Sequence, residues 1–530
     1  MAYYSGTLRP GEVTILSMIN MSGASVSTRR TVIWYSFTIF LSSAILLVLE
    51  IVAGRLIAPY VGVSLYSWTS IIGVILAGLS LGNWLGGRWA DRGGSELGVG
   101  IVLLLAAVFS IASLLFLSLI APLLQQSQLD LISASFIYVL CMFFVPAVLL
   151  GIPTPLLTTL ALHLDSRTGH IVGRMHALAA LGSILGTFVT GYWLIQYFGT
   201  RVVIIGCAVV LVLLAAPFLR RVRTRHAAVL VVLAVGTLSA THVRNGFANP
   251  CERESNYFCM RVVDASQPNY GSARALVLDH LLHGINHEKE PALLISPYVH
   301  AMEEIARVHF QERSDTSLRY FFAGGGSYTQ PRAVRAMYPA AEVTVAEIDP
   351  QVTDTARESL FVDTANMNII HLDARSVLQA SEKQYDVVVT DVFHDISVPY
   401  HLVTREFAQS VKQKLDSKGI YLINIVDIYP DPRLVKSLVK TLQTEFQHVE
   451  VWLEKVPFGL QRITYVISAQ NARALPGEIS SQTGFPRRWL QVKQRLVSRG
   501  TPMAELPLLT DDFVPVERLL AGMLFAPGSY

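Results

Sequence analysis

The stretch LRYFFAGGGSYTQPRAVRAMYPAAEVTVAEIDP, residues 318–350, decides the fold of the C-terminal half of the chain. Residues 318–323 form a short apolar run typical of a buried strand, and three glycines follow it directly. A helical pattern over 329–338 leads to a second strand over 342–349, after which Pro350 opens another helix. This order predicts a βαβ unit with parallel strands.

The same alternation continues towards the C-terminus. Further strands are expected over 368–371, 385–391, 418–426, 448–454 and 461–468, and a helix over 403–414. Strands that alternate with helices predict a parallel sheet covered on both faces.

The composition shift near residue 244 sets the domain boundaries in this half. Residues 244–317 are expected to form a small β-region and linker, with strands near 257–264 and 274–279. Residues 318–470 are expected to form an α/β Rossmann-like domain of the class I methyltransferase type. Residues 471–530 are expected to form a C-terminal helical segment.

A glycine loop follows the first strand of this domain. Gly324, Gly325 and Gly326 allow a tight turn and the close approach of a ligand to the backbone. A glycine loop alone is weak evidence for a site.

Three acids follow the next strands. Glu347 has the spacing at which a carboxylate accepts both ribose hydroxyls, Asp373 is placed to meet an adenine amino group, and Asp391 faces the same crevice. Together with the glycines they predict a nucleoside site at the carboxyl ends of the strands. The alternative is that Glu347 and Asp373 only cap helices.

The first half of the chain predicts a multi-pass membrane bundle of about seven helices over 31–243, preceded by a disordered tail over 1–30. Only 15% of all residues are charged, and the apolar excess lies before residue 245. The apolar runs cover 31–53, 67–87, 99–121, 131–151, 175–197, 202–219 and 227–241. The seventh run is short for a bilayer.

Basic residues predict the orientation of the bundle. They concentrate before the first run and in the loops after the second, fourth and sixth, which predicts a cytoplasmic N-terminus in the cell (inner) membrane. These residues are Arg29, Arg30, Arg88, Arg92, Arg167, Arg174, Arg220, Arg221, Arg223 and Arg225. Seven spans place the C-terminal half outside the cytoplasm, in the periplasm, whereas six keep it inside.

Two cysteines bear on this choice. Cys251 and Cys259 lie just after the seventh run, and a disulfide between them fits an oxidising compartment. The alternative is a pair of small, unpaired residues. We expect the disulfide and an outward-facing domain.

Glycines recur at helical spacing within two apolar runs. Gly78, Gly82 and Gly86 lie on one stripe, and Gly182 and Gly186 repeat the spacing. Such stripes allow close helix packing. The net charge of +3 is too small to indicate a nucleic-acid partner, and no metal site is expected.

The region from about 252 to 427 resembles the spermidine synthase (polyamine aminopropyltransferase) family. The motifs that carry the resemblance are the glycine loop, Glu347-Ile348-Asp349-Pro350, Asp373-Ala374, Tyr385-Asp386, Asp391, Pro399, His401-Leu402 and Glu406-Phe407. A preceding multi-helix region and the closing segment LTDDFVPV, 509–516, are similar to the membrane-fused bacterial branch of this family.

The resemblance implies a reaction. Decarboxylated S-adenosylmethionine is the co-substrate, with no cofactor bound permanently, and an amine attacks its aminopropyl carbon and releases methylthioadenosine. It implies that Glu347 holds the ribose, that Asp373 and Ala374 hold the adenine, and that Asp391 accepts a proton from the attacking nitrogen or orients it. Family members form dimers or tetramers, so a homo-oligomer is implied.

The chain also departs from the family pattern. Ser327 stands where the family has an acid that holds the donor's amino group, and Phe258 stands at the place of a glutamine. His394 replaces a further acid, with Asp395 displaced by one position. Fewer carboxylates make a weaker site for a polycation.

Three residues are candidate substrate contacts by position: His300, His394 and Pro399. His300 lies near the family's Tyr-His-Glu element, although its spacing differs. His394 and His401 are either substrate contacts or ordinary loop histidines.

Three functions remain open from the sequence. The first is an enzyme that transfers an aminopropyl or another alkyl group to a small-molecule amine. The second is a transporter or sensor in the lipid bilayer with a nucleoside- or amine-binding domain. The third is a structural membrane protein with a retired catalytic domain.

Overall fold

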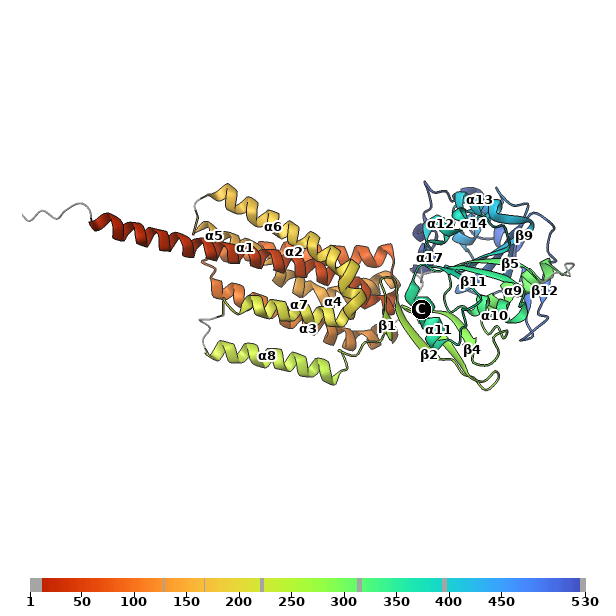
Figure 1. The fold of residues 1–530 in the computed structure, drawn as a ribbon, viewed down its shortest axis with the longest axis horizontal. Coiled ribbons are helices and arrows are strands. Elements are labelled where there is room, and N and C mark those ends of the chain that lie inside the picture. The colour runs from red at the N-terminus through yellow and green to blue at the C-terminus, as the bar shows by residue number, and fades with distance from the viewer. Residues whose placement is uncertain are drawn as a thin grey trace, which may run out of the picture. The chain divides into compact units, whose positions relative to one another are not determined.

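The computed structural model describes residues 12–126, 129–165, 167–219, 224–311, 317–392 and 398–524. The chain divides into two compact units (Figure 1). The first contains Met1–Ala53, Ile71–Ile120 and Tyr138–Ala248, and the second contains Gly54–Ser70, Ala121–Ile137 and Asn249–Tyr530.

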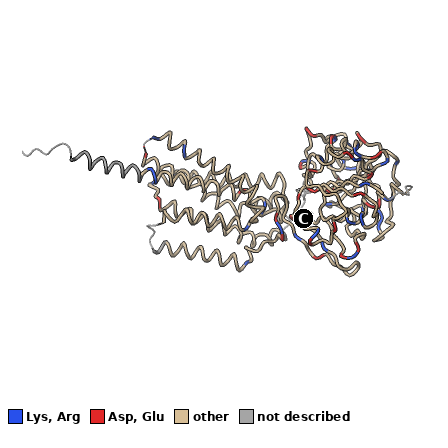
Figure 2. Tube along the Cα trace, in the orientation of Figure 1, with Lys and Arg blue, Asp and Glu red and all other residues tan. Residues whose placement is uncertain are grey.

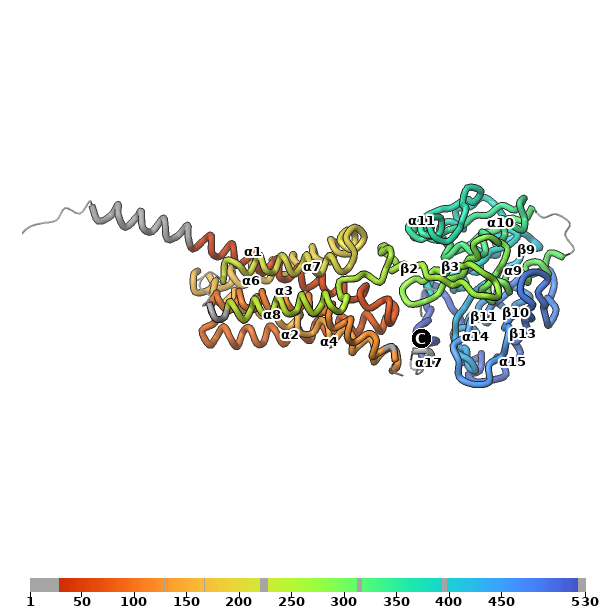
Figure 3. Tube along the Cα trace, turned by 90° about the horizontal axis from the view of Figure 1, so that it is seen from below, coloured from red at the N-terminus to blue at the C-terminus, as the bar shows by residue number. Residues whose placement is uncertain are grey.

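The N-terminal part of the chain is helical. Figures 1 and 3 both show its helices side by side with roughly parallel axes, and Figure 2 shows few charged residues along them. The helices are α1 (Glu12–Val61), α2 (Leu65–Asp91), α3 (Glu96–Gln126), α4 (Leu131–Gly151), α5 (Pro153–Leu162), α6 (Thr168–Val189), the π-helix η1 (Thr190–Leu194), α7 (Ile195–Ala215) and α8 (Thr224–Val243).

Within the described ranges, five helical stretches are long and apolar enough to cross a membrane. They are Thr28–Val61, Leu65–Asp91, Glu96–Leu124, Ile132–Leu162 and Thr168–Ala215, and Ala227–Val243 is a shorter apolar helix. The fifth stretch contains the expected span 175–197 and most of the expected span 202–219. Gly199 lies between them with non-helical dihedrals, φ 73° and ψ 164°, so it breaks the helical run at this point.

The N-terminal boundary differs from the expectation. The tail over 1–30 was expected to be disordered. In the structure it is helical from Glu12, where α1 begins, and the helix continues into the first apolar run. Pro10 and Gly11 precede this helix, and the only proline inside it is Pro59, near its end.

The glycine stripes pack helices closely, as predicted. A Cβ atom on Gly82 of α2 would lie 2.1 Å from the carbonyl oxygen of Val148 in α4. A Cβ atom on Gly182 of α6 would lie 2.1 Å from the carbonyl oxygen of Phe40 in α1. Any larger residue at these positions would push the two helices apart.

The second unit contains two sheets. The smaller is antiparallel, in the order β1 (Arg253–Glu254), β2 (Cys259–Asp264), β3 (Ala273–Leu278) and β4 (Leu281–His287). The larger has the order β12-β13-β10-β11-β9-β8-β5-β6-β7. Its strands are β5 (Arg319–Ala323), β6 (Glu342–Ala346), β7 (Asn368–Ile370), β8 (Tyr385–Thr390), β9 (Leu415–Tyr429), β10 (His448–Leu453), β11 (Gln461–Gln470), β12 (Glu478–Ser480) and β13 (Arg488–Gln491).

The large sheet is mixed, which corrects the expectation of a parallel sheet. Its half from β9 through β8, β5 and β6 to β7 is parallel, but β11 pairs antiparallel with both β9 and β10. A short connection joins β10 to β11, and such a connection can only form an antiparallel hairpin.

The C-terminal region also differs from the expected helical segment. It begins with β12 and β13, because Ile479 and Trp489 are buried in the core of the domain. Up to residue 524, where the described part of the chain ends, the helices that follow are short, namely α15 (Lys493–Val497), η3 (Met503–Glu505), α16 (Val516–Leu519) and α17 (Ala521–Leu524).

The remaining helices of the second unit connect the strands of the large sheet or precede its first strand (Figure 1). They are α9 (Pro297–His309), α10 (Thr329–Met337), α11 (Pro350–Ser359), α12 (Ala374–Ala380), the 3-10 helix η2 (Tyr400–Leu402), α13 (Arg405–Lys414) and α14 (Arg433–Leu442). The strand register pairs Ala323 of β5 with Ala346 of β6 and Thr390 of β8, and pairs Ala346 with Ile370 of β7. The carboxyl ends of four strands therefore meet at one edge of the sheet.

Candidate functional site

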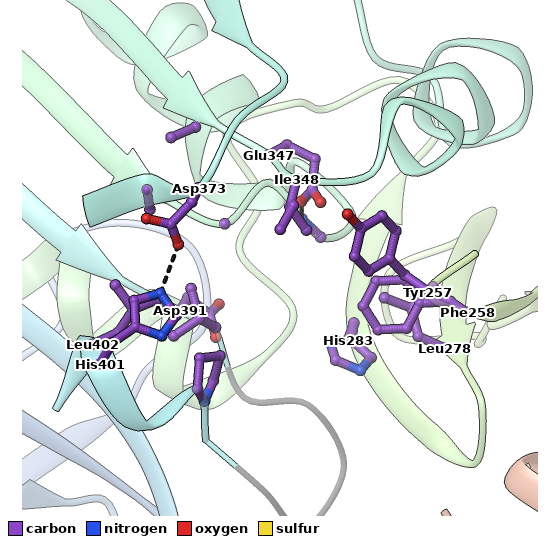
Figure 4. A pocket seen from close by; sticks show the side chains of 16 residues that line it. Tyr257, Phe258, Leu278, His283, Glu347, Ile348, Asp373, Asp391, His401 and Leu402 are labelled. Carbon is purple, nitrogen blue, oxygen red and sulfur yellow. Dashed lines mark hydrogen bonds and ion pairs between the residues drawn. The ribbon is translucent and has the colours of Figure 1, made fainter. Parts of the chain in front are cut away.

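A cavity of about 270 Å³ opens at this edge of the sheet. Its wall contains three predicted groups: the glycine loop, the acids after β6, β7 and β8, and Pro399. In the view of Figure 4, Asp373 and His401 lie at one end of the pocket and Tyr257 and Phe258 at the other. The wall is formed by Tyr257, Phe258, Leu278, His283, Gly324, Gly326, Ala346, Glu347, Ile348, Asp373, Ala374, Asp391, Val392, Pro399, His401 and Leu402.

The glycine loop requires glycine at its first position. Gly324 has a φ of 91°, and a Cβ atom there would lie 2.4 Å from the carbonyl oxygen of Asp391. Gly326 also has a positive φ, of 50°. The loop thus brings the ends of β5 and β8 closer than a side chain would permit.

Glu347 is tied to the glycine loop through its carboxylate. Its Oε2 accepts hydrogen bonds from the amides of Gly325 at 2.8 Å and Gly326 at 3.3 Å, and its Oε1 accepts one from the amide of Asp349 at 3.0 Å. Burial raises the pKa of Glu347, and these three amides act against that rise. None of its bonds caps a helix, so the capping alternative does not describe Glu347.

Asp373 has two roles, one per oxygen. Its Oδ1 accepts a hydrogen bond from the amide of Ser376 at 3.0 Å and so caps α12, as the capping alternative held. Its Oδ2 lies 2.6 Å from Nε2 of His401, at the pocket wall (Figure 4). Burial raises the pKa of Asp373, but the hydrogen bonds from His401 and Ser376 outweigh burial and leave this pKa below its usual value.

Asp391 is held from both sides by neutral donors. Nδ2 of Asn424 donates to its Oδ1 at 2.8 Å, and the hydroxyl of Tyr298 donates to its Oδ2 at 3.2 Å. Burial raises the pKa of Asp391, and these two bonds act against the rise. Burial, followed by the charge of Asp391, raises the pKa of Tyr298 well above its ordinary value, so this hydroxyl remains a donor.

A disulfide-closed loop forms the other end of the pocket. Cys251 and Cys259 are bonded, which confirms the predicted pair, and the loop between them carries Tyr257 and Phe258. The Oγ of Ser255 accepts hydrogen bonds from the amides of Tyr257 at 3.0 Å and Phe258 at 2.9 Å. These bonds fix the turn that brings both rings to the pocket.

Arg55 supports the same loop. It belongs to the same unit, in the segment Gly54–Ser70, and its guanidinium donates to the carbonyl oxygens of Tyr257 at 2.5 Å and Ser255 at 2.9 Å. No pattern in the sequence predicts this contact, since about 200 positions separate the partners.

Three of the predicted site residues within the described ranges lie outside the pocket wall: Gly325, Ser327 and His300. The amide of Gly325 still donates to Glu347, which is part of the wall. Ser327 is buried, and its hydroxyl hydrogen bonds with that of Thr329 at 2.7 Å. His300 is buried in α9, with Nε2 3.4 Å from Glu304 and Nδ1 3.3 Å from Arg487. His394 lies outside the described residues.

Two residues that hydrogen bond to Asp391, and that are not part of the pocket wall themselves, were not predicted as site residues. Tyr298 and Asn424, which hold Asp391, come from α9 and β9 and lack any local motif. Tyr298 does stand beside the element that drew attention to His300, so that element marked the right helix and the wrong side chain.

Part of the second unit is similar to a known protein family. Residues 318–476 match the model of the spermine/spermidine synthase domain. This segment carries the glycine loop, Glu347, Asp373 and Asp391. The C-terminal region therefore contains a spermine/spermidine synthase domain.

Curated relatives match over a part of their length. The chain is 26% identical over 222 residues to the "Probable polyamine aminopropyl transferase" of Bifidobacterium longum, covering 39% of this chain and 50% of that protein. It is 33% identical over 105 residues to the "Polyamine aminopropyltransferase" of Vibrio vulnificus, covering 19% and 34%. A crystal structure of a probable spermidine synthase from Corynebacterium glutamicum matches at 21% identity and a TM-score of 0.40, covering 47% of this chain and 96% of that one.

Proposed function

We propose that the C-terminal domain transfers an aminopropyl group from decarboxylated S-adenosylmethionine to a small-molecule amine. The single observation that carries this proposal is the position of Asp391. It lies in one pocket with Glu347 and Asp373, which are suited to the ribose and the base, inside a domain that matches the spermine/spermidine synthase model.

The chemistry of the step follows from these positions. The neutral amine attacks the propyl carbon bonded to the sulfonium sulfur, the carbon–sulfur bond breaks, and its electron pair leaves with methylthioadenosine. The new ammonium nitrogen gives a proton to Asp391. Because burial raises the pKa of this carboxylate, Asp391 is a stronger base than an exposed aspartate.

The pocket divides the work among the other residues. Glu347 fits the ribose, Asp373 and Ala374 fit the base, and Tyr298 and Asn424 hold the carboxylate that receives the proton. Orientation of this kind lowers the barrier by fixing the reacting groups close together.

The test is product analysis by mass spectrometry. Full-length protein in detergent is given decarboxylated S-adenosylmethionine with putrescine, spermidine or cadaverine. Methylthioadenosine together with an extended amine supports the proposal. Neither product with any of the three amines contradicts it.

A second function is favoured by Ser327. The family resemblance implies an acid at this position, whereas Ser327 is uncharged and its hydroxyl bonds to Thr329. A domain that binds the nucleoside without transferring the group, and so acts as a sensor or as part of a transporter, fits this difference. Methylthioadenosine binding by calorimetry without any product would favour it over the enzyme.

The setting we propose is the inner membrane. Five long apolar helices within the described residues are able to cross a bilayer. A cytoplasmic N-terminus follows from the arginine distribution, and the disulfide between Cys251 and Cys259 supports an oxidising compartment for the C-terminal domain. A homo-oligomer remains part of the proposal through the family resemblance alone.

A further inference from the structure

Asp373 has few acceptor positions left for a ligand. An ionised carboxylate offers about four lone-pair positions and no donor. Ser376 occupies Oδ1 twice, through its amide at 3.0 Å and its hydroxyl at 3.2 Å. Nε2 of His401 occupies one position of Oδ2 at 2.6 Å.

The proton in the bond between His401 and Asp373 can be assigned from chemistry. The carboxylate is ionised at neutral pH, since the pKa of Asp373 lies below its ordinary value, so it can only accept. Nε2 of His401 must therefore carry the hydrogen. This donor holds the carboxylate in one orientation and in its ionised form.

His401 is itself fixed by a chain of ionic and hydrogen bonds. Arg375 donates from Nη1 to the carbonyl oxygen of His401 at 3.2 Å. The same guanidinium binds both carboxylate oxygens of Asp511, at 2.8 and 2.6 Å, and Asp511 also accepts a hydrogen bond from Thr404 at 2.7 Å. The C-terminal segment thus sets the position of the imidazole.

The pocket surrounds this pair with groups that suit a flat ring. Ala374, Pro399 and Leu402 line the wall beside Asp373 and His401. A purine in this end of the pocket would present its edge to Oδ2 of Asp373. An amino group on that edge donates to the free position, whereas an oxo group would set one acceptor against another.

We propose that His401 is a base-selecting residue, which holds the ionised carboxylate of Asp373 in one orientation with one acceptor position free and thereby favours an amino-substituted purine over an oxo-substituted one. This inference rests on the proposed function, because that function places adenine here. His401 acts through Asp373 and is a positioning residue. Its removal frees the carboxylate to rotate, so the amino group of the purine meets an acceptor that is no longer held towards it, and part of the preference is lost.

The experiment compares two ligands by calorimetry on the full-length protein in detergent. The ligands are 5′-methylthioadenosine and 5′-methylthioinosine, which differ by amino against oxo on the purine. The variants are His401→Leu and His401→Gln, whose amide can donate where Nε2 does. The His401 side chain is 47% exposed, so neither change opens the core. A matched control is His448→Leu, at the start of β10 and outside the pocket wall.

The expected result is a fall of about tenfold in the preference for the adenosine in His401→Leu, equal to about 1.4 kcal/mol. His401→Gln should restore most of this preference, and His448→Leu should leave it unchanged. An unchanged preference in His401→Leu, with tight adenosine binding, overturns the inference and leaves the proposed function intact. A failure of Gln to restore a lost preference also overturns it. No adenosine binding by the unaltered protein overturns the proposed function and this inference with it.

Discussion

The hydroxyl of Tyr298 lies 3.2 Å from Oδ2 of Asp391, although 93 positions separate the two residues in the chain. Tyr298 belongs to α9, which precedes the first strand of the large sheet, and Asp391 follows β8. This hydrogen bond joins the family domain to the region before it. The position of the Asp391 carboxylate therefore depends on both regions.

Replacing Asp391 tests its role as the base. Asp391→Asn should lower the turnover rate by about 10²–10⁴-fold, the usual contribution of a general base, while methylthioadenosine binding changes little. Product formation is measured by mass spectrometry and binding by calorimetry. Asp354→Asn, an exposed position on α11, is the matched control. Turnover within twofold of the unaltered protein would exclude Asp391 as the base.

The pH dependence of turnover should report the raised pKa of Asp391. Only the deprotonated carboxylate accepts a proton, so the rate should rise with pH through a pKa above that of an exposed aspartate. Tyr298→Phe removes a donor that lowers this pKa, so the rise should move to higher pH. An acidic limb at the same pH in both proteins would contradict the assignment.

Glu347 and Glu342 lie at opposite ends of β6 and form a matched pair. Both oxygens of Glu347 accept from backbone amides, so Glu347→Gln sets its amide nitrogen against a donor of either the glycine loop or Asp349 and should weaken methylthioadenosine binding about ten- to hundredfold. Glu342→Gln, whose side chain is exposed and pairs with Lys383, should bind normally. Equal affinities would show that the ribose does not contact Glu347.

The disulfide should stabilise the domain. Cys251→Ser with Cys259→Ser releases the closed loop, which should cost about 2–3 kcal/mol of unfolding free energy by the chain-entropy model. The measurement is thermal unfolding with and without reductant, and Cys141→Ala serves as the control. If reductant lowers the melting temperature of the double variant as much as that of the unaltered chain, the disulfide is not the cause.

The side of the membrane on which the C-terminal domain lies can be tested by labelling a new cysteine. The variant is Lys289→Cys, at an exposed position beyond β4, in a chain with Cys141 and Cys207 replaced by alanine. We expect an impermeant maleimide to label it in intact spheroplasts. Labelling only after lysis would place the domain in the cytoplasm.

The sequence predicted the strand-end residues well because parallel strands gather their carboxyl ends at one edge. Gly324, Glu347, Asp373 and Asp391 lie there as expected. Tyr298 and Asn424 could not be read in the same way. The apolar pattern of α9 and of β9 predicts only that these elements are buried. The packing of the two elements in the structure shows that Tyr298 and Asn424 point at Asp391.

Two errors have a similar origin. His300 has a helical neighbour at the site, but its ring lies 5.1 Å from that of Trp489 in the core. The mixed sheet was missed because β11 has the same apolar pattern whichever way it runs. The direction of β11 is set by the hairpin between β10 and β11. The alternation of apolar residues along a strand does not predict its direction.

The loop that carries Tyr257 and Phe258 gives the pocket a maturation step. A newly made chain has two thiols there, so its pocket wall lacks the covalent closure of the finished protein. Ligand affinity would then depend on the oxidation state of these two cysteines as well as on the sequence. Oxidation would close the loop that carries both rings, so the redox state of the compartment would set how firmly this end of the pocket is held.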